Sequence, residues 1–139
     1  MSHEIVESKI DVIERNLRFL RQYENMPAEQ FLDSYKDIQA VKYSLLEAIE
    51  ACIDIAAHII SARGLQRGET YADLFLILGE NGILTSDLSL RLSRMARFRN
   101  LLVHGYSKVD NTRVFELVRT RLVDLEDYIS QVLQSTTGS

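Results

Sequence analysis

Proline, cysteine and tryptophan are scarce in this chain of 139 residues, which contains one Pro, one Cys and no Trp. A single cysteine cannot form an intrachain disulfide, and such sparing use of cysteine is typical of a reducing compartment. With one Pro and six Gly, the sequence also lacks any linker-like or low-complexity stretch. We therefore expect one domain over residues 1–139, with Cys52 as a core thiol between Ala51 and Ile53.

Long hydrophobic runs and strand periodicity are also missing. No apolar run reaches the roughly 18 residues of a membrane span. The first four residues are polar and acidic, where a signal peptide would be basic and then apolar. The sequence thus predicts a cytoplasmic protein without a membrane partner. Apolar residues recur three and four positions apart, and no segment alternates with strand period, so the predicted class is all-α.

Capping and stop signals divide the first half of the chain into three expected helices. The first covers residues 2–25, and Pro27 begins a short helical piece up to residue 32. Asp33 or Ser34 then caps a long central helix that runs to residue 63 and stops at Gly64.

The second half shows the same kind of signals. Thr70 caps a helix to residue 78, which Gly79 and Gly82 are expected to break. Thr85 or Ser86 caps a helix ending near residue 104, and a last helix runs from residue 110 to a frayed tail. The expected architecture is an up-and-down bundle of four main helices plus one or two short ones.

Charge is distributed unevenly along the chain. The formal net charge is −4, which argues against indiscriminate binding of nucleic acid. Residues 91–121, however, contain eight basic and two acidic residues, so this segment carries +6 and the remainder −10. An acidic body with one basic region is the pattern of a protein that binds RNA locally. Alternatively, these arginines simply solvate exposed helix faces.

The basic segment contains a potential phosphodiester-cleaving set at one helix end: Arg97, Arg99, Asn100 and His104, followed by Gly105 as the expected helix stop. A histidine can exchange protons near neutral pH, and an arginine can neutralise a phosphate or its transition state. Asn100 would orient the imidazole or the phosphate. Alone, His104 would more often be a capping residue, and Asn100 a surface amide.

The order Arg99-Asn100-(three residues)-His104-Gly105-Tyr106 resembles the Arg-x4-His-x-Tyr motif of HepT-like toxins in the HEPN superfamily. Residues 50–60 are similar to the central helix of that family, and the all-helical pattern covers nearly the whole chain. The resemblance implies a metal-independent ribonuclease toxin without a cofactor, usually a homodimer. It also implies a partner, an MntA-type nucleotidyltransferase antitoxin, which attaches AMP to the motif tyrosine, here Tyr106.

Helix geometry separates the two motif residues. His104 is rotated by roughly 140° from Arg99, whereas Arg97 and Asn100 lie closer to the line of His104. Arg99 occupies a position of the apolar stripe, where its guanidinium needs a partner. Either it forms an ion pair at the edge of the core, or it lies at a subunit seam where two copies form one cleft. Arg97 remains a rival for the catalytic arginine.

The central helix carries a polar stripe of three carboxylates and one imidazole, which we call the acidic stripe: Glu47, Glu50, Asp54 and His58. Such a stripe is usually a solvated face, and a divalent metal site is the less favoured alternative. We expect Glu50 or Asp54 to pair with Arg99 and support it.

Four residues in or around the motif have further expected roles. Arg94, Arg97 and Lys108 are candidates for RNA contacts because they flank the motif with positive charge. Tyr106 could stack on a base or be an ordinary packing residue, apart from its implied role as AMP acceptor.

The sequence thus predicts an RNA endonuclease that uses Arg99 and His104 from both subunits. Two rival functions stay open: a catalytically silent nucleotide- or RNA-binding module, and a helical partner subunit of a nucleotidyltransferase. The intact pair of arginine and histidine favours the enzyme.

Overall fold

The computed structural model describes residues 3–105 and 109–137, and all regular secondary structure in these ranges is helical. The four long helices are α1 (His3–Arg21), α3 (Tyr35–Arg63), α5 (Ser86–His104) and α7 (Leu122–Thr137). The shorter ones are α2 (Ala28–Leu32), α4 (Tyr71–Glu80) and α6 (Asn111–Thr120). The predicted all-α bundle is confirmed. None of these helices is both long and apolar enough to cross a membrane.

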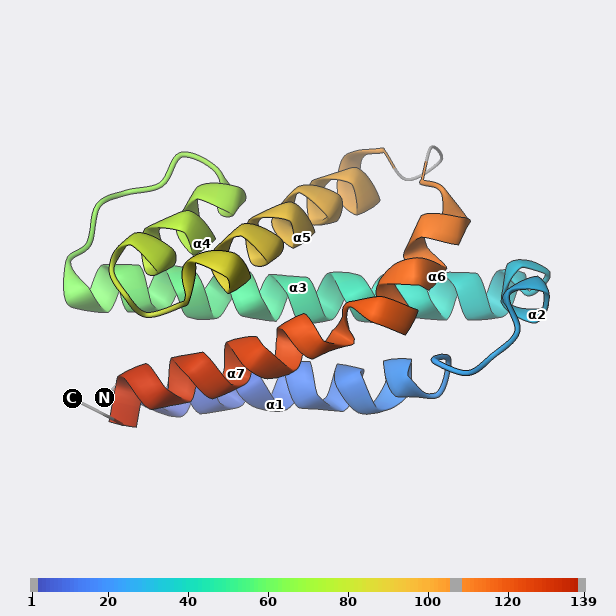
Figure 1. Ribbon diagram of the computed structural model, residues 1–139, viewed down its shortest axis with the longest axis horizontal. Helices are drawn as coiled ribbons and strands as arrows, with labels where there is room; N and C mark the ends of the chain where they lie inside the picture. Colours follow the sequence, from blue (N-terminus) through green and yellow to red (C-terminus); the bar gives the residue numbers. More distant parts are fainter. Residues whose placement is uncertain (1–2, 106–108, 138–139) are drawn as a thin grey trace.

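The long helix α3 runs through the middle of the molecule (Figure 1). Helices α1 and α7 pack together on one side of it, α4 and α5 pack on the other, and α2 and α6 lie at the end remote from both termini. Ser34, one of the two expected caps, accepts a hydrogen bond from the backbone N–H of Asp37, and Gly64 ends α3 with a left-handed φ of 65°. Helix α3 buries residues on several sides, Cys52 among them, as expected of a central helix.

Helix α1 buries the predicted apolar stripe, which consists of Val6, Ile10, Ile13, Leu17 and Leu20. The helix ends at Arg21, and the chain continues in tight turns to Met26 instead of remaining helical to residue 25. The buried Tyr23 explains the early end, because its hydroxyl donates to Asp37 on α3 at 3.0 Å.

Gly79 does not break its helix, contrary to the prediction from sequence. Helix α4 continues through it to Glu80, and the break comes at Gly82, which has a positive φ of 74°. A β-carbon at position 79 would lie 2.5 Å from the Oγ atom of Ser89 on α5. Glycine is therefore required here because α4 and α5 approach closely.

The last predicted helix is also corrected, because α6 and α7 are separate helices that meet at Arg121. No proline or glycine marks this break in the sequence. Helix α6 packs on α2, where Phe115 stacks on Phe31 with ring centroids 4.8 Å apart, whereas α7 packs on α1 and α5. One straight helix could not reach both surfaces.

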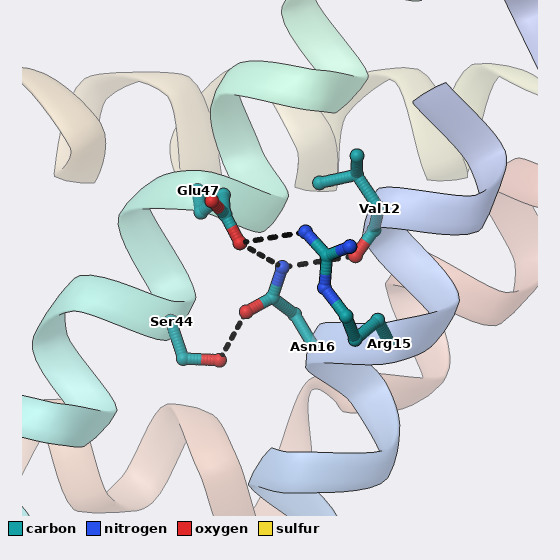
Figure 2. Close-up of polar contacts among 5 residues, drawn as sticks. All are labelled: Val12, Arg15, Asn16, Ser44 and Glu47. Atoms are coloured by element: carbon teal, nitrogen blue, oxygen red, sulfur yellow. Dashed lines mark hydrogen bonds and ion pairs between the residues drawn. The ribbon is translucent and has the colours of Figure 1, made fainter. Parts of the chain in front are cut away.

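A polar cluster joins α1 to α3 (Figure 2). The side-chain amide of Asn16 donates to the Val12 carbonyl at 2.9 Å and to the Glu47 carboxylate at 2.8 Å. The Ser44 hydroxyl donates to the Asn16 carbonyl oxygen at 2.6 Å, and Arg15 reaches Glu47 at 3.5 Å. Asn16 and Ser44 are both buried, whereas Glu47 is 34% exposed and Arg15 lies at the surface, so this polar seam is closed on the side of Asn16 and Ser44, where its hydrogen bonds are made within the protein.

Candidate active site

Arg99 lies on the side of α5 that faces α3 and α4. Its Nη2 atom is 2.8 Å from the Oε2 atom of Glu50, and its Nη1 atom donates to the Asn100 carbonyl oxygen at 3.2 Å. The guanidinium carbon lies 4.9 Å from the centroid of the Tyr71 ring, at the start of α4. The Arg99 side chain is only 15% exposed, so three neighbours hold its cation at the protein surface.

The Arg99 ion pair borders an open hollow of about 230 Å³, lined by Glu50, Ile53, Asp54, Tyr71 and Arg99. Glu50 is 44% exposed, and the buried Nε atom of Arg99 has no hydrogen-bond partner in the described part of the chain. The positive group is therefore fixed, and solvent reaches it through the hollow beside the half-exposed Glu50, not through the buried Nε atom. A guanidinium that its neighbours hold in place can bind an anion from solvent without changing its position.

His104 is the last residue of α5 and is exposed. The helix ends there as expected, with the N–H of Gly105 donating to the Leu101 carbonyl at 2.8 Å. The φ of Gly105 is −115°, so the helix does not end in the left-handed geometry of a C′ glycine. Five residues of helix separate His104 from Arg99 by about 7.5 Å along the axis and about 140° around it. The two motif side chains therefore leave α5 in different directions.

The structure describes three of the five other candidate residues around the motif. Arg94 and Arg97 are exposed on α5, so both side chains are accessible to a ligand in solution. Asn100 is half-buried, and its carbonyl oxygen already accepts from Arg99. Tyr106 and Lys108 lie outside the described residues.

The three carboxylates of the acidic stripe on α3 form ion pairs with three different cations. Glu47 pairs with Arg15, Glu50 with Arg99, and Asp54 with Lys9 at 3.0 Å. Of the two carboxylates expected to support Arg99, Glu50 touches it and Asp54 does not. In the ranges that the structure describes, no three His, Cys, Asp or Glu side chains are grouped as metal ligands.

A family model described as "Ribonuclease HepT-like" matches residues 13–132. The chain belongs to the HepT-like ribonuclease family. The family resemblance expected from the motif is thereby confirmed, and the Arg99/His104 segment lies within the matched range.

Two curated relatives of this HepT-like chain are nucleases. The tRNA nuclease HepT of Aphanizomenon flos-aquae is 33% identical over 131 residues, which cover 92% of this chain and 87% of the relative. The mRNA nuclease HepT of Shewanella oneidensis is 31% identical over 130 residues, which cover 94% of this chain and 97% of the relative.

A solved structure has the same fold over almost its whole length. The tri-AMPylated HEPN toxin of Shewanella oneidensis, in complex with its MNT antitoxin, superposes with a TM-score of 0.87 at 30% identity. The match covers 94% of this chain and 98% of the toxin. The bundle around Arg99 is therefore a HEPN fold.

Tyr71 is a residue of the candidate site that the sequence did not reveal. Its position directly after the cap Thr70 predicts only the start of a helix. Its ring meets Arg99 because α4 folds back against α5, which is a long-range contact that no local pattern encodes. One of six tyrosines, it carried no distinguishing signal.

Proposed function

We propose that this HepT-like chain is an RNA endonuclease toxin that works without a metal. The observation that carries the proposal is the fixed guanidinium of Arg99 beside an open hollow, in a chain whose curated relatives are a tRNA and an mRNA nuclease. A pre-fixed cation is what a transition state with a doubly charged phosphorane requires.

The proposed reaction is an internal transesterification. His104 removes the proton from a ribose 2′-hydroxyl, whose oxygen attacks the adjacent phosphorus, while the bond to the 5′-oxygen of the next nucleotide breaks. The imidazolium of His104 then gives its proton to that leaving oxygen, and the product carries a 2′,3′-cyclic phosphate. Arg99 neutralises the charge on the phosphorane, and Asn100 positions the imidazole or the phosphate through its side-chain amide. Arg94, Arg97 and Lys108 contact flanking phosphates.

A homodimer completes the proposed site. Arg99 and His104 of one chain diverge by about 140°, so a second copy is needed to bring an arginine and a histidine together. Helices α3 and α5 run in opposite directions (Figure 1), so Tyr43, seven residues before Glu50, lies toward the same end as His104. Tyr43 is 65% exposed, and Leu101 and Val103 near His104 are also exposed apolar residues. Apolar exposure around an incomplete site supports self-association.

Regulation by a cognate nucleotidyltransferase antitoxin is the remaining part of the proposal. The transferase would attach AMP to Tyr106, two residues after His104. Each AMP brings a phosphodiester charge and a base to the site, so an incoming RNA phosphate meets a like charge and a filled cleft. The AMPylated state of the similar Shewanella toxin in complex with its MNT antitoxin supports this step.

The mechanism is tested by incubating the protein with RNA in excess EDTA and analysing the product ends. We expect cleavage and 2′,3′-cyclic phosphates. A strict requirement for added Mg²⁺, or products with 5′-phosphates, would overturn the mechanism. No cleavage by the purified protein under any condition would favour a silent binding module.

The shared site is tested by complementation. Mixed dimers of Arg99→Ala and His104→Ala subunits contain one intact site only if the arginine and histidine come from different chains. We therefore expect activity to return on mixing two inactive variants. A mixture that stays inactive although mixed dimers form, or a monomer by light scattering at micromolar concentration, would contradict the shared site.

The role of Tyr106 is tested by intact mass after co-expression with the cognate transferase. A gain of adenylyl mass that is absent in Tyr106→Phe supports the role. An unchanged gain in that variant removes this tyrosine from the mechanism.

A further inference from the structure

A second hollow, of about 160 Å³, lies between α5, α6 and α7, whereas the Arg99 hollow faces α3 and α4. Four arginines line it: Arg91, Arg94, Arg113 and Arg121. The rest of its lining is one carboxylate and three apolar side chains, Asp124, Met95, Phe98 and Leu117. We call this site the arginine hollow. Of the residues that line it, only Arg94 already has a role in the proposed function, as a contact to a flanking phosphate.

Within residues 3–105 and 109–137, only one of the four arginines is neutralised by an ion pair. Arg91 is bound by Asp87 at 3.0 Å and by Asp124, whose side chain is only 2% exposed. Arg121 attracts the Asp124 carboxylate electrostatically, but the two side chains are too far apart to form an ion pair. Arg94 and Arg113 are exposed, and neither has a carboxylate partner in the part of the chain that the structure describes. The hollow therefore keeps an excess of positive charge.

The apolar side chains that line the hollow favour binding of an anion by the arginines. The guanidinium carbon of Arg113 lies 5.8 Å from the centroid of the Phe98 ring, which is only 4% exposed. A guanidinium held over an aromatic ring loses less freedom when it binds, and its planar fork matches two oxygens of a phosphate. The low-dielectric lining also strengthens attraction between the arginines and an anion compared with open solvent.

The position of the hollow along α5 indicates which anion it receives. Arg94 precedes His104 by ten residues, or about 15 Å of helix, and the exposed Arg97 lies between them, close to the line of His104. A polyanion that has one phosphate at His104 can therefore pass Arg97 and Arg94 and enter the hollow. Spaced cations beside apolar surface are typical of sites that follow a single nucleic-acid strand.

We propose that the arginine hollow is a second RNA-binding site, which holds a phosphate of single-stranded RNA a few nucleotides from the bond that is cut. The proposal takes its substrate class from the proposed nuclease function, but its test does not require cleavage. It adds Arg113 and Arg121 to the RNA contacts expected from the motif.

The test measures binding of a labelled single-stranded RNA to His104→Ala protein over a range of salt concentrations. Adding Arg113→Gln should weaken binding several-fold at low salt and reduce the slope of log K against log salt by about one. Arg119→Gln is the matched control, because Arg119 is also exposed on α6, lies 5.7 Å from the ring of Phe115, and is outside the hollow. A double variant Arg113→Gln/Arg121→Gln should reduce the slope further.

Each outcome decides one proposal. Equal salt slopes for Arg113→Gln and Arg119→Gln would overturn the RNA site. Unchanged RNA binding together with weakened binding of the nucleotidyltransferase would assign the hollow to that protein instead, and would also overturn it. If wild-type protein binds RNA through Arg113 but does not cleave it, the nuclease proposal fails while the RNA site stands.

Discussion

Glu47 and Glu50 lie one turn apart on α3, and their surroundings differ in kind. Glu47 belongs to the polar seam with α1, where Asn16 and Ser44 are buried and hydrogen-bonded inside the protein (Figure 2). Glu50 is 44% exposed and holds Arg99, whose Nε atom has no partner among the described residues, beside an open hollow of about 230 Å³. Both carboxylates are partly exposed, Glu47 at 34%, but Glu47 is bound to buried polar groups and Glu50 lines an open hollow.

The difference separates a structural polar group from one that we propose to be functional. A buried network that satisfies itself stabilises one packing of two helices and has no capacity for a ligand. A cation held by a half-exposed partner keeps capacity for an external anion, because solvent can still reach the site. Substitutions in the polar seam should therefore affect stability, and substitutions around Arg99 should affect activity.

The largest effect is expected for the motif residues. His104→Ala and Arg99→Ala should each reduce the rate of RNA cleavage by about 10²- to 10⁴-fold, because general-base catalysis and charge stabilisation are lost. The melting temperature should change little, since both side chains reach the surface. Arg97→Ala is the control for the rival arginine, and it should raise KM more than it lowers kcat. A larger fall in kcat for Arg97→Ala than for Arg99→Ala would exchange their roles.

The polar seam should show the opposite response. Asn16→Ala leaves the buried Ser44 hydroxyl without its acceptor, which costs about 1–3 kcal/mol of unfolding free energy. Gln66→Ala is the matched control, because Gln66 also donates an amide hydrogen bond to a carboxylate, that of Glu80 at 2.8 Å, but is exposed. Denaturant unfolding should show a change within about 0.5 kcal/mol for the control. Equal losses of unfolding free energy in Asn16→Ala and Gln66→Ala would contradict a structural role for the polar seam.

Exchanging the two carboxylates for amides compares the regions directly. Glu50→Gln should lower kcat about tenfold, because Arg99 loses the charge that fixes its guanidinium. Glu47→Gln should lower the melting temperature without a comparable fall in kcat. Glu50 is a positioning residue, so Glu50→Asp should recover part of the lost rate. If both amide variants lower kcat equally, the contrast between the regions is wrong.

The smallest effect is expected at Tyr71. Replacing it with Leu removes a cation–π contact worth about 0.5–1 kcal/mol at an exposed site, so kcat should fall only a few-fold. Tyr35→Leu is a suitable control, since Tyr35 is 76% exposed at the start of α3. A fall in activity as large as that of Arg99→Ala would mean that Tyr71 itself touches the substrate.

The sequence predicted the fold well wherever local signals decide it. The apolar stripe of α1, the cap at Ser34 and the stop at Gly64 all reflect interactions within a few residues, and all are confirmed. Two of the corrected elements show how distant segments decide the outcome. Gly79 is set by the approach of Ser89, and the break at Arg121 comes from the separate packing of α6 and α7.

The candidate site divides in the same way. The sequence alone determined the HepT-like motif, its position at the end of α5 and the basic character of residues 91–121, because residue type and spacing suffice for these. Only the tertiary structure decided that Glu50 and not Asp54 pairs with Arg99, that Tyr71 covers the guanidinium, and that Arg113 faces Phe98. Those pairs join separate helices, and their geometry depends on how the bundle packs.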